Sequence, residues 1–479
     1  MTRTNKAGKK TGKSFTGLQK NDIFTVRIDD LSADGAGIGH AEPDGFTVFI
    51  KDAIPGDVVK AKLMKRKASY GFARLLSLES LSPDRVPPGC PAARQCGGCQ
   101  LQHLSYPTQL AYKEKMVQNN LARIGGIMPS SYEFLPIIGM EDPWHYRNKA
   151  QYPVGPGKDG KLVIGFYAGR THEIIDLTHF ASPSGCMLQM PAGQQVLDVC
   201  REWMDSHGIP PYDEKSGSGL IRHILVRSGH TSGEVMVCLV VNGDSLPHQD
   251  ELICGLRRIP GIKSICISPN KSRNNVIMGS RADCLWGEAY ITDWIGPVCY
   301  RISALSFFQV NPVQTARLYE TALSFADPGP MDTVWDLYCG IGTISLFLAR
   351  KAGHVWGVEI IPQAVEDAKA NAVLNGITNA GFFCGKAEDL AGNALTIPKP
   401  DIIVVDPPRK GCDASLLDFI AAQSPSRIVY VSCSSATLAR DLKILALKGY
   451  LPRKIRCCDM FPHTIHVETV VLLSQEDNA

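Results

Sequence analysis

A cysteine stands between a run of β-forming residues and a helix-like segment in "YVSCSSATLARDL", residues 430–442. Ligands gather at the carboxyl ends of strands in a parallel sheet, so Cys433 occupies a position where chemistry is common. A thiolate there can act as a nucleophile, and we expect nearby helix amino termini to lower its pKa. Packing is the alternative role for a single cysteine, so the neighbouring motifs must decide.

A glycine turn in "DLYCGIGTISLFLA", residues 336–349, joins a strand to a helix. Gly340 and Gly342 would let the backbone approach a ligand, although a tight turn without a ligand is the alternative. Glu359 ends the next apolar run, where an acid can accept ribose hydroxyls. Asp336 before the turn would repel a pyrophosphate and favour a cationic or zwitterionic cofactor. The combination resembles S-adenosylmethionine-dependent methyltransferases.

The motif "IIVVDPPRKG", residues 402–411, ends a further strand. In amino-group methyltransferases a comparable Asp-Pro-Pro precedes an aromatic residue that stacks on the base, but here Arg409 follows, which disfavours methylation of an exocyclic amine. Carbon 5 of uracil is a poor nucleophile until a thiolate adds to carbon 6 and converts the ring into an enolate. Cys433 could supply that thiolate.

The same chemistry requires a base that removes the carbon 5 proton after methyl transfer. The segment "DMFPHTIHVETVVLL" near the carboxyl terminus precedes a last apolar strand and offers four candidates. These are Asp459, His463, His466 and Glu468. The chemistry alone does not choose among them.

Four motifs together closely resemble the RNA uracil-5-methyltransferases, especially the ribosomal RNA branch: "SFFQVN", "DPPRKG", "VSCSSATLARDL" and "FPHTIHVETVVLL". The resemblance implies that Cys433 is the nucleophile and Glu468 the base. We interpret His463 and His466 as supporting or structural residues. It implies cofactor contacts from Gln309, Tyr338, Glu359 and Asp406. The implied reaction is methylation of a uridine in 23S ribosomal RNA by S-adenosylmethionine, giving 5-methyluridine.

Three cysteines gather in "CPAARQCGGCQ", and their C-x5-C-x2-C spacing indicates a metal site. Zinc sites usually pair two short ligand units, and no second unit follows Cys90, Cys96 and Cys99. Iron-sulfur clusters accept three clustered cysteines and a distant fourth. The family resemblance implies a 4Fe-4S cluster with Cys186 as the fourth ligand, and Cys200 is the second candidate.

The elements that must position these groups are short strands alternating with helix-length segments from about residue 330 onward. Such alternation predicts a mostly parallel, doubly wound sheet with helices on both faces. Its strands would end at Asp336, Glu359, Glu388, Asp406 and Cys433.

Composition changes along the chain predict a multidomain protein in four parts. Residues 1–14 form a disordered basic arm, and residues 15–78 a small antiparallel, OB-like barrel, which the resemblance identifies as an RNA-binding TRAM domain. Residues 79–300 form a central α/β domain with the cysteine loop, and residues 301–479 a Rossmann-like methyltransferase domain.

Two basic segments are candidates for RNA contact. The stretch at residues 60–74 could face a phosphate backbone or be a solvated edge strand. The stretch "WHYRNKAQYPVG", residues 144–155, interleaves aromatic and basic side chains and could contact RNA or line a solvent-facing sheet. Extruding a uridine from folded RNA costs a few kcal/mol, which such contacts would supply.

The whole chain has 479 residues, a net charge of +3 and sixteen cysteines, with no apolar run long enough for a membrane span. We therefore expect a monomeric cytoplasmic enzyme with metal-binding or nucleophilic cysteines. Three other functions are alternatives.

RNA cytosine-5 methylation uses the same addition of a thiol to the pyrimidine ring. A non-catalytic RNA-binding protein would lack one of the groups that methyl transfer needs, and none is missing here. A disulfide-handling or metal-handling protein would leave the presence of Gln309 and Glu359 unexplained.

Overall fold

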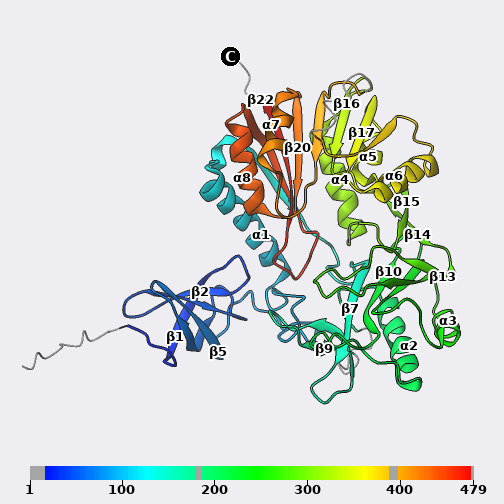
Figure 1. Ribbon diagram of the computed structural model, residues 1–479. Helices are drawn as coiled ribbons and strands as arrows, with labels where there is room; N and C mark the ends of the chain where they lie inside the picture. The colour runs from blue at the N-terminus through cyan, green and yellow to red at the C-terminus, as the bar shows by residue number, and fades with distance from the viewer. Residues whose placement is uncertain (1–16, 178–184, 388–396, 476–479) are drawn as a thin grey trace, which may run out of the picture. The chain divides into compact units, whose positions relative to one another are not determined.

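The computed structural model describes residues 17–177, 185–387 and 397–475 (Figure 1). The chain divides into two compact units, one running to Pro87 and including His103–Ser105, the other formed by the remaining residues. The basic arm expected at residues 1–14 and the expected strand-end residue Glu388 lie outside the described residues. The two units are described separately below.

The first unit is a closed five-stranded barrel in the order β1-β2-β3-β5-β4. Its strands are β1 (Ile23–Leu31), β2 (Gly37–Ala41), β3 (Phe46–Ile50), β4 (Val58–Arg66) and β5 (Tyr70–Ser80). The predicted barrel is confirmed, but it is not wholly antiparallel because β3 and β5 pair in parallel. Strand β4 pairs with both β1 and β5, so residues 60–66 are not an edge strand.

Strand β4 shows how the sequence specifies the two faces of the barrel. Val59, Ala61 and Leu63 are fully buried in the barrel core, whereas the alternate residue Lys60 is exposed. Successive side chains of a strand point to opposite faces, so the basic residues necessarily lie outside. The outer surface of β4 is therefore available to a polyanion.

The second unit contains a seven-stranded sheet in the order β13-β12-β11-β10-β7-β8-β9. Its strands are β7 (Lys149–Pro156), β8 (Leu162–Tyr167), β9 (Ile174–Asp176), β10 (Ile221–Ser228), β11 (Val235–Val241), β12 (Ile262–Pro269) and β13 (Asp283–Gly287). Helices α2 (Ala192–Ser206) and α3 (Gln249–Leu256) pack on one face of this sheet. The other face carries Leu225, Met236 and Cys238, which share a core with the hairpin β14 (Tyr290–Ile295) and β15 (Val298–Ser303).

An eight-stranded sheet in the order β18-β17-β16-β19-β20-β22-β21-β6 forms the rest of this unit. Its strands are β6 (Glu133–Ile138), β16 (Thr333–Leu337), β17 (His354–Glu359), β18 (Ala380–Cys384), β19 (Ile402–Val405), β20 (Arg427–Ser432), β21 (Tyr450–Cys458) and β22 (Glu468–Gln475). The five strands from β16 to β20 are parallel, as predicted, and β22 runs antiparallel to β20.

Helices cover both faces of this sheet, also as predicted (Figure 1). In β19, Ile402 and Val404 face one core, while Ile403 and Val405 face the other. Helices α4 (Pro312–Ala326), α5 (Thr343–Leu348) and α6 (Pro362–Leu374) contribute to the first core. Helices α1 (Tyr106–Asn120), α7 (Ala414–Ala422) and α8 (Ser435–Ala446) contribute to the second.

The boundary expected at residue 300 does not separate the two sheets, because a segment from the central region joins the carboxyl-terminal one. Strand β6 pairs in parallel with β21, and helix α1 packs beside α8. The short helical turns η1 (Leu121–Gly125) and η2 (Pro129–Ser131) connect α1 to β6.

Within the described residues, every helix is too short or too polar to cross a membrane.

Helix α1 is fixed to the carboxyl-terminal sheet by a fully buried ion pair. Lys113 Nζ lies 2.5 Å from Asp459 Oδ1, with both side chains completely inaccessible to solvent. Lys113 also donates to the carbonyl of Phe461, and Tyr106 donates to the second carboxylate oxygen of Asp459. The pair therefore holds the segment that precedes β22.

We predict that Lys113→Met destabilises this unit by about 3–5 kcal/mol, because the Asp459 carboxylate would stay buried without its cation. Lys113→Met combined with Asp459→Asn should recover part of the loss. Urea denaturation measures the shift in midpoint, with the exposed Lys115→Met as the control. An unchanged midpoint in Lys113→Met would contradict the role assigned to the pair.

Candidate functional site

Strand pairing places Cys433 near Glu468. The last pair between β20 and β22 joins Ser432 to Thr469. Cys433 directly follows the end of β20, and Glu468 is the first residue of β22. A partly exposed thiol and a buried carboxylate therefore lie at the same end of the two paired strands, and the charge of Glu468 acts on the pKa of Cys433.

Two of the other base candidates, Asp459 and His463, are engaged elsewhere. Asp459 is neutralised by Lys113, and the ring of His463 stacks on Trp144 with centroids 3.9 Å apart. The amide of His463 donates to Gln109 Oε1. These contacts give Asp459 and His463 structural roles in the segment that leads to β22.

Burial raises the pKa of Glu468, and the neighbouring carboxylate of Asp406 raises it further, while the charge of Arg409 acts against both. The pKa of Asp406 is likewise raised by burial. A protonated carboxyl group cannot act as a base, so Glu468 gains basic function as pH rises or as a positive charge enters the site. The two neighbouring carboxyl groups therefore favour the binding of a cation.

The thiol of Cys433 departs from expectation. Its position just before the amino terminus of α8 matches the expected geometry, yet its pKa is raised to about 11, not lowered. Burial is the main cause, followed by the charges of Glu468 and Asp406, and Arg409 only partly compensates. The expectation of a lowered pKa was therefore wrong for the protein without ligands, because desolvation and two carboxylates outweigh the helix terminus.

Three of the expected cofactor residues lie side by side, each at the carboxyl end of a neighbouring parallel strand. Leu337 pairs with Val358 on β17 and with Val405 on β19, so the residues directly beyond these three are Tyr338, Glu359 and Asp406. Parallel strands bring such residues to a common edge.

The glycine turn above them leaves room for a ligand. Gly340 has a φ of +56°, and a Cβ built on it would meet no atom within 4 Å. Its amide donates to Glu359 Oε2 at 3.2 Å, and the amide of Ile361 donates to Oε1 at 2.9 Å, so the carboxylate is held in place. Gly342, with a φ of +81°, begins α5. This cradle fits an adenosyl group with a ribose at Glu359.

Asp336 lies beneath the turn and is fully buried. Ser345 Oγ donates to its Oδ2 at 2.5 Å, while Oδ1 has no hydrogen-bond partner. Burial raises the pKa of Asp336 to about 7. An unpartnered acidic oxygen under the cradle favours a cationic ligand, as the sequence indicated.

Gln309 comes from a separate segment that precedes α4. Its carbonyl accepts from Asn148 Nδ2 at 3.0 Å, and the side chain is buried. Nearby, Ser306 Oγ donates to Asp367 on α6, the helix that follows Glu359. Arg227 of the central sheet donates to the Ser306 carbonyl. The segment is thus fixed between the two sheets of this unit.

The four cysteines expected to bind a metal border one cavity of about 390 Å³. Cys90, Cys96 and Cys186 each act on the pKa of Cys99, and burial raises the pKa of all four thiols. The second candidate, Cys200, lies on α2 and is fully buried in the core between this helix and the central sheet. The structure therefore brings Cys186 to the loop, and not Cys200.

The distances between these thiols can be compared with those in a zinc site. Within the described part of the chain, no cysteine belongs to a group of three ligand atoms that all lie within 4.8 Å of one another. A tetrahedral zinc ion with Zn–S bonds of about 2.3 Å holds its sulfur atoms roughly 3.8 Å apart. The sulfur atoms of these cysteines are therefore not gathered as the ligands of a single zinc ion are.

The same cavity is lined by residues near the thiol and base, including Arg409 and His466. Arg147 and Lys149 of the basic and aromatic segment also line it. Two of the aromatic residues of that segment are not exposed, as stacking on RNA would require. Tyr146 and Tyr152 are buried in the protein, so their rings serve packing.

A contact that the sequence did not reveal joins the cysteine loop to the base. The amides of Gln100 and Leu101, directly after Cys99, both donate to the carbonyl of His463, at 3.0 and 2.9 Å. His463 lies five residues before Glu468. Sequence motifs carry no signal for such backbone bonds, which depend on where two distant loops meet.

The strand-end site and its cradle define the class: an S-adenosylmethionine-dependent methyltransferase. A family model described as tRNA (Uracil-5-)-methyltransferase matches residues 294–476, and a TRAM domain model matches residues 18–76. An uncharacterized RNA methyltransferase of Halalkalibacterium halodurans is 49% identical over 459 residues, which cover 95% of this chain and 98% of that protein. Another, from Listeria innocua, is 46% identical over 461 residues, covering 95% and 98%.

Among solved structures, the crystal structure of Pyrococcus abyssi tRNA (uracil-54, C5)-methyltransferase in complex with S-adenosyl-L-homocysteine resembles this chain with a TM-score of 0.74. It is 28% identical, and the match covers 94% of this chain and 99% of that one. The chain belongs to the RNA uracil-5-methyltransferase family. It is an S-adenosylmethionine-dependent enzyme with an amino-terminal TRAM domain.

The charges around Cys433 predict how fast it reacts with iodoacetamide. At pH 9 the Glu468→Gln variant should be alkylated at Cys433 about threefold to tenfold faster than the native protein, since half to one pKa unit of like-charge repulsion is removed. Arg409→Gln should be slower. Mass spectrometry of the Cys433 peptide gives the rate, with the exposed Cys254 in the same digest as the internal control. Equal rates in all three proteins would refute this electrostatic account.

Proposed function

We propose that this enzyme methylates carbon 5 of a uridine in 23S ribosomal RNA, with Cys433 as the nucleophile and Glu468 as the base. The observation that carries the proposal is the pairing of β20 with β22, which sets the thiol near the carboxylate. Asp406 and Arg409 act electrostatically on both groups.

S-adenosylmethionine would supply the methyl group as an electrophile on a sulfonium sulfur, which would leave as S-adenosylhomocysteine with the electron pair of the broken carbon–sulfur bond. The Cys433 thiolate would form a bond to carbon 6 of the uracil, and the electron pair of the 5,6 double bond would form the bond from carbon 5 to the methyl carbon. Glu468 then removes the proton from carbon 5. The 5,6 double bond re-forms as the bond to Cys433 sulfur breaks, which returns the thiolate and leaves 5-methyluridine.

The raised pKa values set the order in which these groups become active. Before ligands bind, the Cys433 thiol is protonated at neutral pH and the carboxyl groups of Asp406 and Glu468 share a raised affinity for protons. A sulfonium cation beside them would lower all three pKa values. Cofactor binding would therefore favour the thiolate and the basic carboxylate together.

We infer that the methyl donor lies over the cradle at Gly340. Glu359, held by two backbone amides, would accept the ribose hydroxyls. Tyr338 would pack against the adenosyl group, while Gln309 and Asp406 would contact its polar and charged parts. The open space at Gly340 and the unpartnered oxygen of Asp336 support this placement.

Two RNA classes remain to be distinguished as the substrate. Ribosomal RNA is the first candidate, because the cysteine loop and the sequence motifs resemble the ribosomal RNA branch of the family. The basic residues Arg147 and Lys149, which line the cavity, could bind the phosphates of either RNA. Transfer RNA is the second candidate, because the Pyrococcus abyssi enzyme that matches over nearly the whole chain is named for transfer RNA. Both substrates are cytoplasmic, where we propose that the enzyme acts as a monomer.

The function is tested with purified enzyme, S-adenosylmethionine and either unmodified 23S ribosomal RNA or a transfer RNA pool. We expect 5-methyluridine in the ribosomal RNA by nucleoside mass spectrometry. Cys433→Ala should lose both turnover and covalent RNA capture. Glu468→Gln should lose turnover by at least about a hundredfold, in line with general-base catalysis, yet accumulate RNA linked to Cys433.

Each outcome of that experiment has a separate meaning. Methylation of transfer RNA alone would reject the substrate but keep the chemistry. Normal turnover in Glu468→Gln would mean that another residue is the base. The control Glu366→Gln changes an exposed carboxylate on α6 and should behave as the native enzyme.

We also propose that Cys90, Cys96, Cys99 and Cys186 hold a 4Fe-4S cluster. Burial and mutual repulsion raise the pKa of these thiols, so a bound cationic group is needed to keep four thiolates together. The cluster would brace the loop whose residues Gln100 and Leu101 hold the carbonyl of His463. The cluster could therefore affect catalysis through its structural role alone, by holding the segment that leads to Glu468.

We predict that Cys186→Ser lowers the iron and sulfide content of anaerobically purified protein, whereas the matched variant Cys200→Ser leaves both unchanged. Hydrogen exchange at residues 459–468 should also become faster in Cys186→Ser, because the His463 anchor would loosen. Colourless protein containing zinc would overturn the cluster assignment. Loss of iron from Cys200→Ser alone would reject Cys186 as the fourth ligand.

A further inference from the structure

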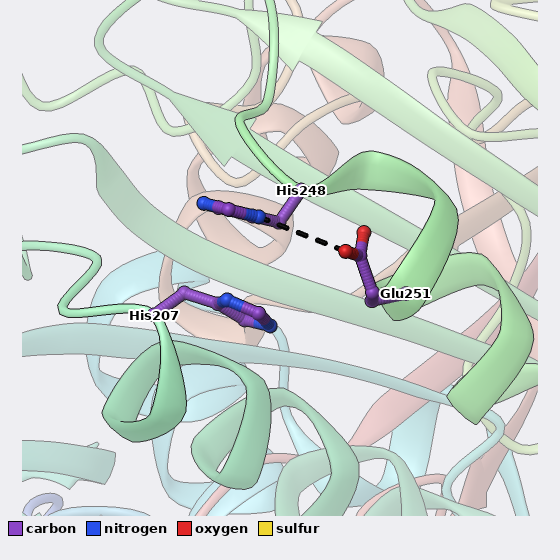
Figure 2. Close-up of side chains that lie close together, drawn as sticks. All are labelled: His207, His248 and Glu251. Carbon is purple, nitrogen blue, oxygen red and sulfur yellow. Dashed lines mark ion pairs between the residues drawn. The ribbon is translucent and has the colours of Figure 1, made fainter.

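Three potential metal ligands meet at the edge of the central sheet, away from the residues that line the cysteine cavity. They are His207 after the end of α2, His248 before the start of α3, and Glu251 in the first turn of α3. One ligand atom from each lies within 4.8 Å of the other two, and this is the one such group found among the residues that the structure describes. Figure 2 shows the two imidazoles stacked, with the carboxylate beside His248.

A single buried tryptophan holds the backbone of both histidines. The amide of His207 donates to the carbonyl of Trp203 at 3.2 Å, and the Trp203 indole donates to the carbonyl of His248 at 3.0 Å. Trp203 is only 5% exposed and lies in the core between α2 and α3. Residues 41 positions apart in the sequence are therefore held in register by hydrogen bonds that do not use their side chains.

The side chains of the three residues contact one another. The imidazole rings of His207 and His248 are stacked, with centroids 4.1 Å apart and an interplanar angle of 16°, so one ring must turn about its Cβ–Cγ bond for both nitrogen lone pairs to point at one ion. His248 Nδ1 is 3.7 Å from Glu251 Oε1, which is beyond hydrogen-bond range. His248 and Glu251 are exposed, so an ion could enter from solvent and complete its coordination with water.

Two imidazoles and one carboxylate form a ligand set that binds first-row divalent metals, with zinc in three-ligand sites as the familiar example. Calcium and magnesium prefer oxygen ligands, so two nitrogen ligands argue against them. We propose that His207, His248 and Glu251 bind one divalent transition-metal ion of the zinc type. The ion joins the end of α2 to the start of α3 and stabilises the helical layer that covers the central sheet.

This inference is independent of the methyl-transfer site and of the cysteine cavity, since none of the three residues lines that cavity. It is tested on full-length, untagged protein that carries its own complement of cysteine-bound metal. Because free thiols also bind zinc, isothermal titration with Co²⁺ under anaerobic conditions is combined with X-ray absorption at the cobalt edge.

Native protein should bind one additional Co²⁺ whose first shell contains only nitrogen and oxygen, including two imidazoles. His207→Ala and His248→Ala should each weaken this binding at least tenfold, and Glu251→Gln should weaken it to a smaller degree. Co²⁺ should raise the melting temperature of native protein and leave that of His207→Ala and His248→Ala unchanged. The three ligands are on or near the surface, so these variants should fold.

The matched control is His172→Ala. His172 forms an exposed pair with Glu214, with Nδ1 and Oε2 2.9 Å apart, but has no second imidazole in the pair. Its loss should leave the additional Co²⁺ site intact. Equal affinity and stoichiometry in native protein and in His207→Ala/His248→Ala would overturn the proposal, as would sulfur in the first shell of the additional ion.

Discussion

The antiparallel pairing of β20 with β22 is the constraint on which the rest of the structure depends. A shift of one residue in this register would move Glu468 to the other face of the sheet, because side chains alternate along a strand. The register is fixed by buried apolar side chains on both faces, such as Val429 and Tyr430. The hydrophobic pattern of two strands thus determines whether a thiol and a carboxylate meet.

This pairing has an electrostatic consequence. Asp336 and Glu468 are buried and Asp406 is half-buried near one edge of the sheet, and desolvation raises the pKa of each. Acids so close together cannot all be ionised without a nearby cation. A cationic methyl donor resolves that conflict while it delivers the reacting carbon, so the site couples ligand binding to activation of its own groups.

Much of the fold could be predicted because its signals are local. The alternation of apolar runs with helix-length segments marked β16, β17, β18, β19 and β20, and alternating residues marked the barrel strands. What could not be predicted depends on distant partners. Nothing in "EFLPII" indicates that β6 adds to the carboxyl-terminal sheet beside β21, and nothing near Lys113 indicates that it meets Asp459.

The candidate site divides in the same way. Motif spacing identified Tyr338, Glu359 and Asp406, and strand pairing sets them at one level of the sheet. The chemical state of Cys433 could not be inferred from its place before a helix, since its pKa depends on burial and on carboxylates from two other strands. Likewise, the aromatic residues Tyr146 and Tyr152 match a stacking surface in sequence but are used for packing.

The central claim is that Cys433 adds to the pyrimidine ring and that a proton must then leave carbon 5. Ribosomal RNA transcribed with 5-fluorouridine in place of uridine tests it directly, because fluorine cannot leave as a proton does. With S-adenosylmethionine present, the account predicts a stable complex in which the Cys433 peptide carries a nucleotide with both fluorine and an added methyl group. A nucleotide attached to another cysteine, or no attachment at all, would contradict it.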